Sequence, residues 1–255
     1  MALSPQALLK GIVQRVLPSF NFDSTNVDVA LRQGSYGELY NQPLVRKSHN
    51  LADEGSYFVA NNAQTAIAPT FNTAFTATAP FLSVYNGNAT SRVYLDYAAL
   101  VAAVAGTFAS GGVQTAGAVV IDNGNRYSSG GTALTANSPN MAASVNASNV
   151  TIYCGAITAT AASGAARTIV GQRNLRPAAS ATVIGAIGDQ LQLNFGAVEG
   201  LVNGSVTVAN PSLIPQALPP IVIGPQQSAL VYLYWPGATT PAAATYLPEI
   251  GFWVR

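Results

Sequence analysis

The hydrophobic and polar positions of this chain alternate in short runs that turn residues separate. Phe81–Tyr85 and Val93–Tyr97 flank the glycine-containing stretch Asn86–Thr90, a pattern that predicts a β-hairpin. Residues 98–105 either continue the second strand or form a short helix. The other strand candidates are residues 71–76, 113–121, 132–136, 150–158, 167–175, 189–195, 204–209, 219–223, 229–235 and 249–254. Many short strands predict a mainly β protein, an antiparallel β-sandwich of jelly-roll type.

Two runs near the C-terminal end are apolar at consecutive positions instead of alternating. They are Leu230–Trp235 and Ile221–Ile223. A strand that is apolar on both faces needs cover on both sides, so we expect these strands at the centre of a sandwich or at a subunit interface.

The N-terminal region differs from the rest of the chain. Ser4 and Pro5 form a favourable helix start, and Pro18 ends the pattern that follows. Between them the apolar residues recur at helical spacing, which predicts a short amphipathic helix. These residues are Leu8, Leu9, Ile12, Val13, Val16 and Leu17.

Residues 19–62 lack strong periodicity, which is unusual for so long a stretch inside a compact domain. We interpret residues 1–62 as a helix followed by an extended arm, and residues 63–255 as the β-sandwich body. Aromatic side chains in the arm are suited to anchor it on a neighbour, because tyrosine buries a large area at low conformational cost. The alternative is a poorly ordered leader.

Charge is scarce. Charged residues make up 8% of the chain, with Lys+Arg 11 and Asp+Glu 10, whereas about 25% is usual for a soluble domain. Disorder is not expected, because 49% of the residues are apolar. A surface with so few charges is poorly protected against association, so we expect a permanent assembly with other subunits.

The sequence gives little support for a reaction centre. A catalytic triad needs a histidine, and the single histidine, His49, lies in a polar segment of the predicted arm. Cys154 lies in an apolar run that predicts a buried side chain. The carboxylates, such as Asp96 and Asp122, are dispersed and show no acid–base spacing. We therefore expect no enzyme, no cofactor and no metal site.

Neither nucleic acid nor a membrane is an expected partner. The densest positive segment holds only Arg167, Arg173 and Arg176, fewer basic groups than a phosphate footprint needs. No apolar stretch reaches the length of a membrane span without interruption. Lys10 and Arg15 lie within or after the first apolar positions, which does not fit a signal peptide, so we expect assembly in a cytoplasm.

Three stretches carry a resemblance to a known class of proteins. They are Tyr85–Tyr97, Asn125–Leu134 and Leu193–Gly200, set in an Ala-, Thr- and Gly-rich chain with little lysine. Over about residues 30 to 255 the chain resembles virion structural proteins of tailed bacteriophages, of the head-associated or decoration type. The resemblance implies a jelly-roll-like subunit, a trimer or other homo-oligomer, that binds the major capsid protein or other virion proteins. It implies no catalytic residues.

The sequence thus leads to two functional hypotheses. In the first, the chain is a structural virion subunit whose arm clamps the oligomeric body onto the capsid. The candidate interface residues are Leu9, Val13, Tyr36, Tyr40, Tyr57, Phe58, Tyr232, Tyr234 and Trp235. In the alternative, it is a fibre- or spike-type protein that binds a host receptor or glycan through an exposed aromatic cluster, for which the candidates are Tyr127, Tyr153, Tyr246 and Trp253.

Overall fold

The structure is a computed structural model that describes residues 47–107, 114–141, 148–177, 183–184, 187–196, 213–237 and 242–255. The chain divides into two compact units, Met1–Val45 and Arg46–Arg255, and every described residue belongs to the second. The predicted N-terminal helix, the candidate interface residues Leu9, Val13, Tyr36 and Tyr40, and the strand candidate 204–209 lie outside the described residues.

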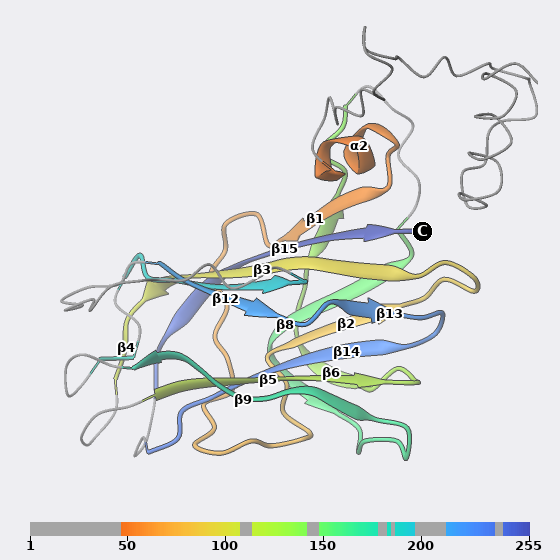
Figure 1. The fold of residues 1–255 in the computed structure, drawn as a ribbon. Coiled ribbons are helices and arrows are strands. Elements are labelled where there is room, and N and C mark those ends of the chain that lie inside the picture. The colour runs from red at the N-terminus through yellow and green to blue at the C-terminus, as the bar shows by residue number, and fades with distance from the viewer. Residues whose placement is uncertain are drawn as a thin grey trace, which may run out of the picture. The chain divides into compact units, whose positions relative to one another are not determined.

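The described residues form a mainly β fold in which two large sheets pack against each other (Figure 1). The seven-stranded sheet has the order β12 (Leu213–Leu218), β11 (Gln190–Phe195), β3 (Val93–Val104), β15 (Thr245–Val254), β1 (Tyr57–Asn61) and β7 (Thr135–Asn137), and β13 (Ile221–Ile223) also pairs with β3. The six-stranded sheet has the order β6 (Tyr127–Ala133), β8 (Val150–Ala159), β2 (Leu82–Asn86), β14 (Ser228–Tyr234), β5 (Gln114–Asp122) and β9 (Arg167–Pro177). A small sheet pairs β4 (Gly106–Thr107) with β10 (Val183–Ile184).

The pairing is antiparallel throughout both large sheets, except between β11 and β12, which run parallel. The predicted β-sandwich is therefore confirmed, while its jelly-roll connectivity stays a prediction. The strand candidates within the described residues coincide at least in part with observed strands, apart from residues 71–76. Residues 98–105, left open between strand and helix, belong to β3 as far as Val104.

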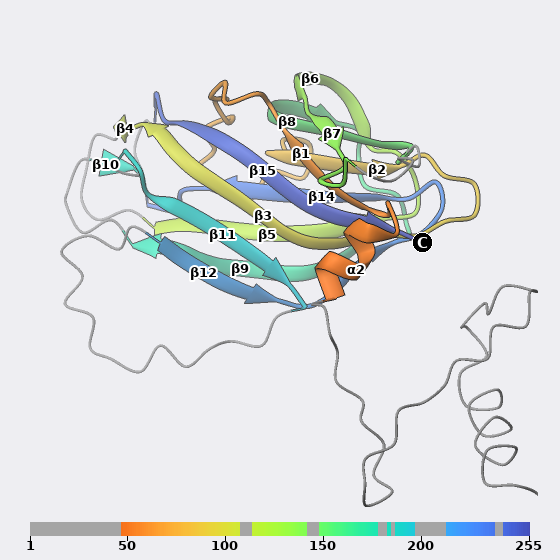
Figure 2. The ribbon, with the colours of Figure 1, turned by 90° about the horizontal axis from the view of Figure 1, so that it is seen from above.

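A short helix, α2 (Lys47–Asp53), precedes the first strand. Gly55, two residues after its last residue, has a φ of 70°, which is favourable for glycine, and the Ser56 amide donates a hydrogen bond to the Leu51 carbonyl at 2.9 Å. Figure 2 shows α2 beside the end of the seven-stranded sheet at which β15 ends.

The first strand, β1, lies within the region interpreted as an arm. It pairs with β15 along its whole length and with β7 on its other side. The sandwich therefore begins before residue 63, because β1 is an inner strand of the seven-stranded sheet.

The core lies between the sheets and draws on both. Phe252 and Ile250 of β15 are fully buried, as are Val84 of β2 and Trp235, which follows β14. The Phe252 ring stacks on Phe58 with the centroids 5.5 Å apart. Alternate residues of each strand thus meet at one interface, as an aligned sandwich requires.

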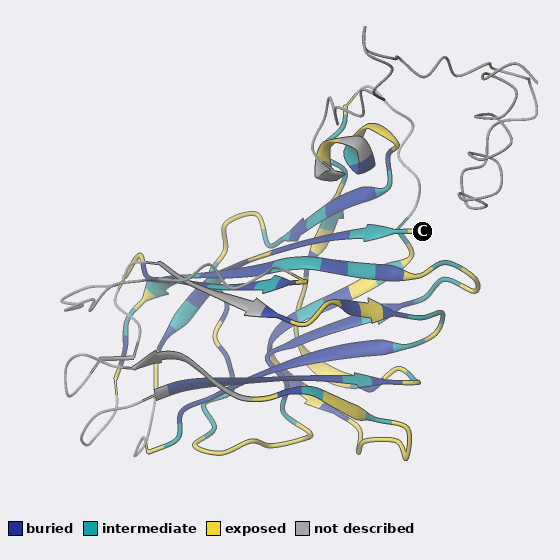
Figure 3. Cartoon of the chain, viewed as in Figure 1, coloured by how far each residue is buried: buried dark blue, intermediate teal, exposed yellow. Residues whose placement is uncertain are grey.

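The central strand β14 is buried on both faces, as its sequence predicts, and Figure 3 shows it buried along its length. One face contributes to the main core, while Leu230, Tyr232 and Tyr234 form a second cluster on the outer face. That cluster lies under the segment of residues 71–79, whose Phe75 ring lies 4.8 Å from the Tyr232 ring between centroids. The segment predicted as a strand at 71–76 is thus an irregular cover, not a strand.

A buried polar network fixes this cover. The Arg126 guanidinium donates hydrogen bonds to the carbonyls of Ala77 (2.7 Å) and Thr160 (2.8 Å), and the Tyr232 hydroxyl donates to Ala77 (2.9 Å). Arg126 and Asp122 are both buried and form an ion pair at 3.7 Å. Burial alone would raise the pKa of Asp122, but hydrogen bonds from Ser163 and the charge of Arg126 outweigh it and lower that pKa.

The hairpin predicted from residues 81–97 is wrong. Its two runs are real strands, but β2 lies in the six-stranded sheet and β3 in the seven-stranded sheet, so the connection crosses from one sheet to the other. The Asn86 side chain supports the crossing, because its amide donates to the carbonyls of Ser91 (2.8 Å) and Gly224 (2.9 Å). A glycine-containing connection suits a crossing as well as a hairpin turn.

Replacing the fully buried Phe252 by alanine should lower the free energy of unfolding by about 3–5 kcal/mol, because the cavity removes contacts with both sheets. Urea denaturation measures this change. The control is Met141→Ala at a side chain that is 98% exposed, for which we expect less than about 0.5 kcal/mol. Equal effects of the two substitutions would contradict the core assignment.

Asp122→Asn should lower the free energy of unfolding by about 2–4 kcal/mol at neutral pH, because it leaves Arg126 buried without its counter-charge. Since folding lowers the pKa of Asp122, its stabilising contribution is complete above about pH 4 and is lost as the pH falls through the lower, folded value. The difference between wild type and variant should therefore shrink in acid, as measured by urea denaturation across that range. Asp53→Asn, on the exposed side of α2, is the matched control. A difference independent of pH would contradict this prediction.

Candidate functional site

Four neighbouring strands of the seven-stranded sheet place side chains in one row. The register pairs Tyr57 with Trp253, Trp253 with Tyr94, and Tyr94 with Val222. The adjacent row, which includes Phe58, points into the core. Because directly paired residues share a face and successive residues alternate, the row of Tyr57, Trp253, Tyr94 and Val222 lies on the outer face.

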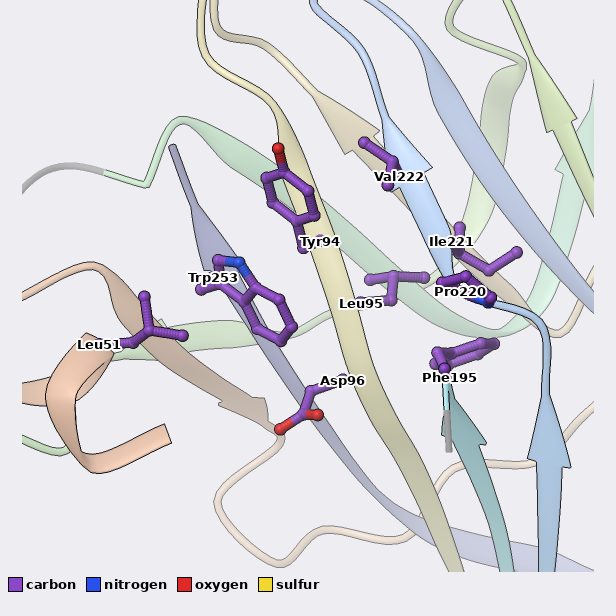
Figure 4. Close-up of a pocket in the computed structure, with 10 residues that line it drawn as sticks. Leu51, Tyr94, Leu95, Asp96, Phe195, Pro220, Ile221, Val222 and Trp253 are labelled. Carbon is purple, nitrogen blue, oxygen red and sulfur yellow. The ribbon is translucent and has the colours of Figure 1, made fainter. Parts of the chain in front are cut away.

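The row contains a pair of stacked aromatic rings. The Tyr94 and Trp253 rings are nearly parallel, at 5°, with their centroids 5.5 Å apart. In Figure 4 both rings turn a face toward the viewer, and Asp96 lies beside the Trp253 ring. Both side chains are partly exposed. Together they form an aromatic surface that is wider than either ring.

A β-bulge adds a carboxylate to this face. Leu95 pairs with Phe252 and Tyr97 with Gly251, so Asp96 is the extra residue between them. A bulge changes the direction in which side chains point, and here two consecutive residues, Asp96 and Tyr97, both lie outside the core. The Tyr57 hydroxyl donates a hydrogen bond to Asp96 Oδ2 at 2.8 Å, and the Tyr97 hydroxyl donates to Glu249 Oε1 at 2.6 Å.

These residues border a pocket of about 520 Å³, which is within the usual size of small-molecule sites. Its wall continues across the sheet to Phe195 at the end of β11 and to Pro220 before β13, and α2 contributes Leu51 (Figure 4). Among the described residues that line it, Asp96 supplies the only carboxylate. The pocket is thus a mainly apolar, aromatic surface with one acidic group.

The tyrosine that holds Asp96 remains a hydrogen-bond donor over the ordinary pH range. Burial raises the pKa of Tyr57, and the hydrogen bond to Asp96 together with the charge of that residue raises it further. Burial and the bond to Glu249 raise the pKa of Tyr97 in the same way. Tyr57 holds the Asp96 carboxylate through Oδ2, while Asp96 Oδ1 has no hydrogen-bond partner among the described residues.

The structure places the described candidate interface residues inside the chain's own fold. All are at most 7% exposed: Tyr57, Phe58, Tyr232, Tyr234 and Trp235. These side chains are thus buried within the chain's own fold, and the prediction that they contact a partner stays a prediction. Apolar residues on both faces of a strand do not distinguish cover by the same chain from cover by another subunit.

The aromatic residues considered for receptor binding divide into three groups. Tyr246 is buried and packs against Phe81. Tyr127 and Tyr153 stack on each other with centroids 3.8 Å apart and are partly exposed on the six-stranded sheet. Trp253 lines the pocket. Tyr94 was not predictable as a partner of Trp253, because nothing in the sequence shows that β3 and β15 pair.

Two residues considered for chemistry lie elsewhere. His49 is exposed on α2. Cys154 is fully buried in β8, as predicted, and burial raises the pKa of its thiol. A reactive thiolate at this position is therefore not expected.

Among the described residues, no three His, Cys, Asp or Glu side chains lie together as metal ligands would. Nor does that part of the chain contain a helix with the length and apolarity to cross a membrane.

Comparisons with models of protein families, with curated proteins and with solved structures find no match to this chain. The function is therefore inferred from the sequence and from the geometry of the pocket and sheets.

Gly251→Ala should disturb the hydrogen-bonded tyrosines beside the pocket. A Cβ at this position would lie 2.6 Å from the Tyr57 hydroxyl and would clash with the Tyr97 ring. We expect the free energy of unfolding to fall by about 1–3 kcal/mol, as measured by urea denaturation. Gly171→Ala in β9 is the control, because an added Cβ meets nothing within 4 Å there. A Gly251→Ala protein as stable as the control would contradict this packing.

Proposed function

We propose that the protein is a non-enzymatic structural subunit of a bacteriophage virion, an oligomeric capsid decoration or head-associated protein that binds the shell and stabilises it. The observation that carries the proposal is the shortage of charge, 8% of residues on a β-sandwich of ordinary core construction. Without charged side chains a large surface lacks electrostatic protection against association. A subunit that is permanently covered by neighbours does not need that protection.

Several of the few charged residues are buried or paired within the fold, which strengthens this argument. Asp122, Arg126 and Asp189 are buried, so they contribute little to the surface. Glu54 and Arg255 pair with each other at 3.0 Å. The charge left to keep neighbouring copies apart is therefore even smaller than the composition indicates.

The clamp that attaches the body to the shell is proposed to lie before the sandwich. The chain's first unit, Met1–Val45, contains the candidate contact residues Leu9, Val13, Tyr36 and Tyr40. Since β1 is an inner strand of the sheet, the clamp ends before α2 and not at residue 62. We propose that the oligomer, a trimer or other closed assembly, forms through the body.

Replacing Leu9 and Val13 by Asp in the full chain should abolish cosedimentation with phage particles, because both are predicted apolar contacts of the clamp. Thermal melting and oligomer size should not change. Met141→Asp, at an exposed body position, is the control and should bind normally. Imaging of particles with and without the protein gives its position and copy number. A solitary monomer at high concentration, with no affinity for any particle, would contradict the proposal.

The second candidate function is a fibre- or spike-type virion protein that binds a host receptor or glycan. The aromatic pocket at Tyr94 and Trp253 favours it, because an exposed aromatic cluster is what such a function requires. Binding of the purified protein to host cells, compared with binding to particles, separates the two candidates.

A further inference from the structure

The pocket on the seven-stranded sheet combines two recognition elements. The first is the aromatic surface of Tyr94 and Trp253, whose rings are nearly parallel and partly exposed. A flat aromatic face attracts flat, weakly polar surfaces such as the C–H face of a sugar ring. Val222, 40% exposed and paired with Tyr94, extends this apolar surface by one strand.

The second element is a carboxylate held in one orientation. Tyr57 is 7% exposed and donates to Asp96 Oδ2, which leaves Oδ1 as an acceptor for a ligand. The bulge places Asp96 two residues along the strand from Tyr94, beside the Trp253 ring (Figure 4). Pockets of this kind use a few placed polar groups to orient a ligand that apolar contacts hold.

This combination selects among ligand classes. A purely apolar ligand would bury Asp96 Oδ1 without a hydrogen-bond donor, which is costly. A guanidinium prefers both carboxylate oxygens, and Tyr57 already occupies one of them. A pyranose ring offers an apolar C–H face and hydroxyl donors together, so it satisfies the rings and Asp96 at the same time.

We infer that this pocket is a carbohydrate-binding site, in which a pyranose ring lies on the Tyr94–Trp253 surface and one of its hydroxyls donates to Asp96 Oδ1. The inference deepens the second candidate function, because it names the ligand class of the same pocket, and it does not depend on the proposed assembly role. A single sugar of this size should bind with a dissociation constant of roughly millimolar order.

Tryptophan fluorescence provides a direct readout, because the chain has two tryptophans in different surroundings. Trp235 is fully buried, whereas Trp253 lines the pocket and is partly exposed. The full-length protein is titrated with methyl α-glucopyranoside, methyl β-galactopyranoside and N-acetylglucosamine, and quenching by acrylamide is followed. At least one of these sugars should protect Trp253 from the quencher. Methylguanidinium, tested in parallel, should give no protection.

Variants assign the effect to the pocket, with binding measured by saturation-transfer NMR. Asp96→Asn should weaken binding by about tenfold to a hundredfold, because a hydrogen bond to a charged group is lost. The Asn side chain is similar in size and still accepts from Tyr57, so the fold should persist. Trp253→Ala should weaken binding at least about tenfold, since it removes half of the aromatic surface. Tyr127→Ala removes a stacked ring from the other sheet and should leave binding unchanged.

Three results would overturn the inference. They are no protection by any of the sugars, sugar binding that Asp96→Asn and Trp253→Ala leave intact, and Asp96-dependent binding of methylguanidinium alone. Thermal melting of each variant confirms that a loss of binding is not a loss of fold. A negative result here leaves particle cosedimentation and oligomer size unaffected, so it is distinguishable from failure of the assembly proposal.

Discussion

The antiparallel pairing of β3 with β15 is the constraint on which both the core and the pocket depend. Its register places Leu95 opposite Phe252 on the inner face and Tyr94 opposite Trp253 on the outer face. One residue of slippage would exchange the two faces and expose the phenylalanine. The bulge at Asp96 then shifts the alternation within the same strand, so that Ala98 returns to the core. The burial of apolar side chains in the core therefore fixes the arrangement of the polar and aromatic groups on the outer face.

The sequence predicts the elements of this fold well because strand alternation is a local property. β5, β8, β9, β11 and β14 all coincide with apolar or alternating runs. Pairing partners are not local, and there the sequence is a poor guide. The runs on either side of Asn86–Thr90 are separated by a short glycine-containing stretch, yet β3 pairs with β11, β13 and β15, all of which lie far along the chain. The covering segment around Phe75 has alternating apolar and polar residues like a strand, but its residues 71–76 form no strand in either sheet.

The candidate site was predictable only in part. Alternation already puts Tyr94 and Asp96 on one face of their strand, and Trp253 is one of only two tryptophans in the chain. Their meeting depends on long-range register and on a bulge, neither of which leaves a local signal. In the same way, two-sided apolarity correctly predicts that β14 is covered, but not that residues of the same chain provide the cover.

The position of β15 in the sheet also bears on how the protein reaches its folded state. This strand lies between β3 and β1 and pairs with both, although about the whole length of the body separates it from β1 along the chain. During synthesis, β1 and β3 are therefore made long before the strand that joins them, and each carries an open edge until residues 245–254 leave the ribosome. Contacts so distant in sequence make folding slow. We expect the nascent chain to need protection from premature edge-to-edge association until that last strand is inserted.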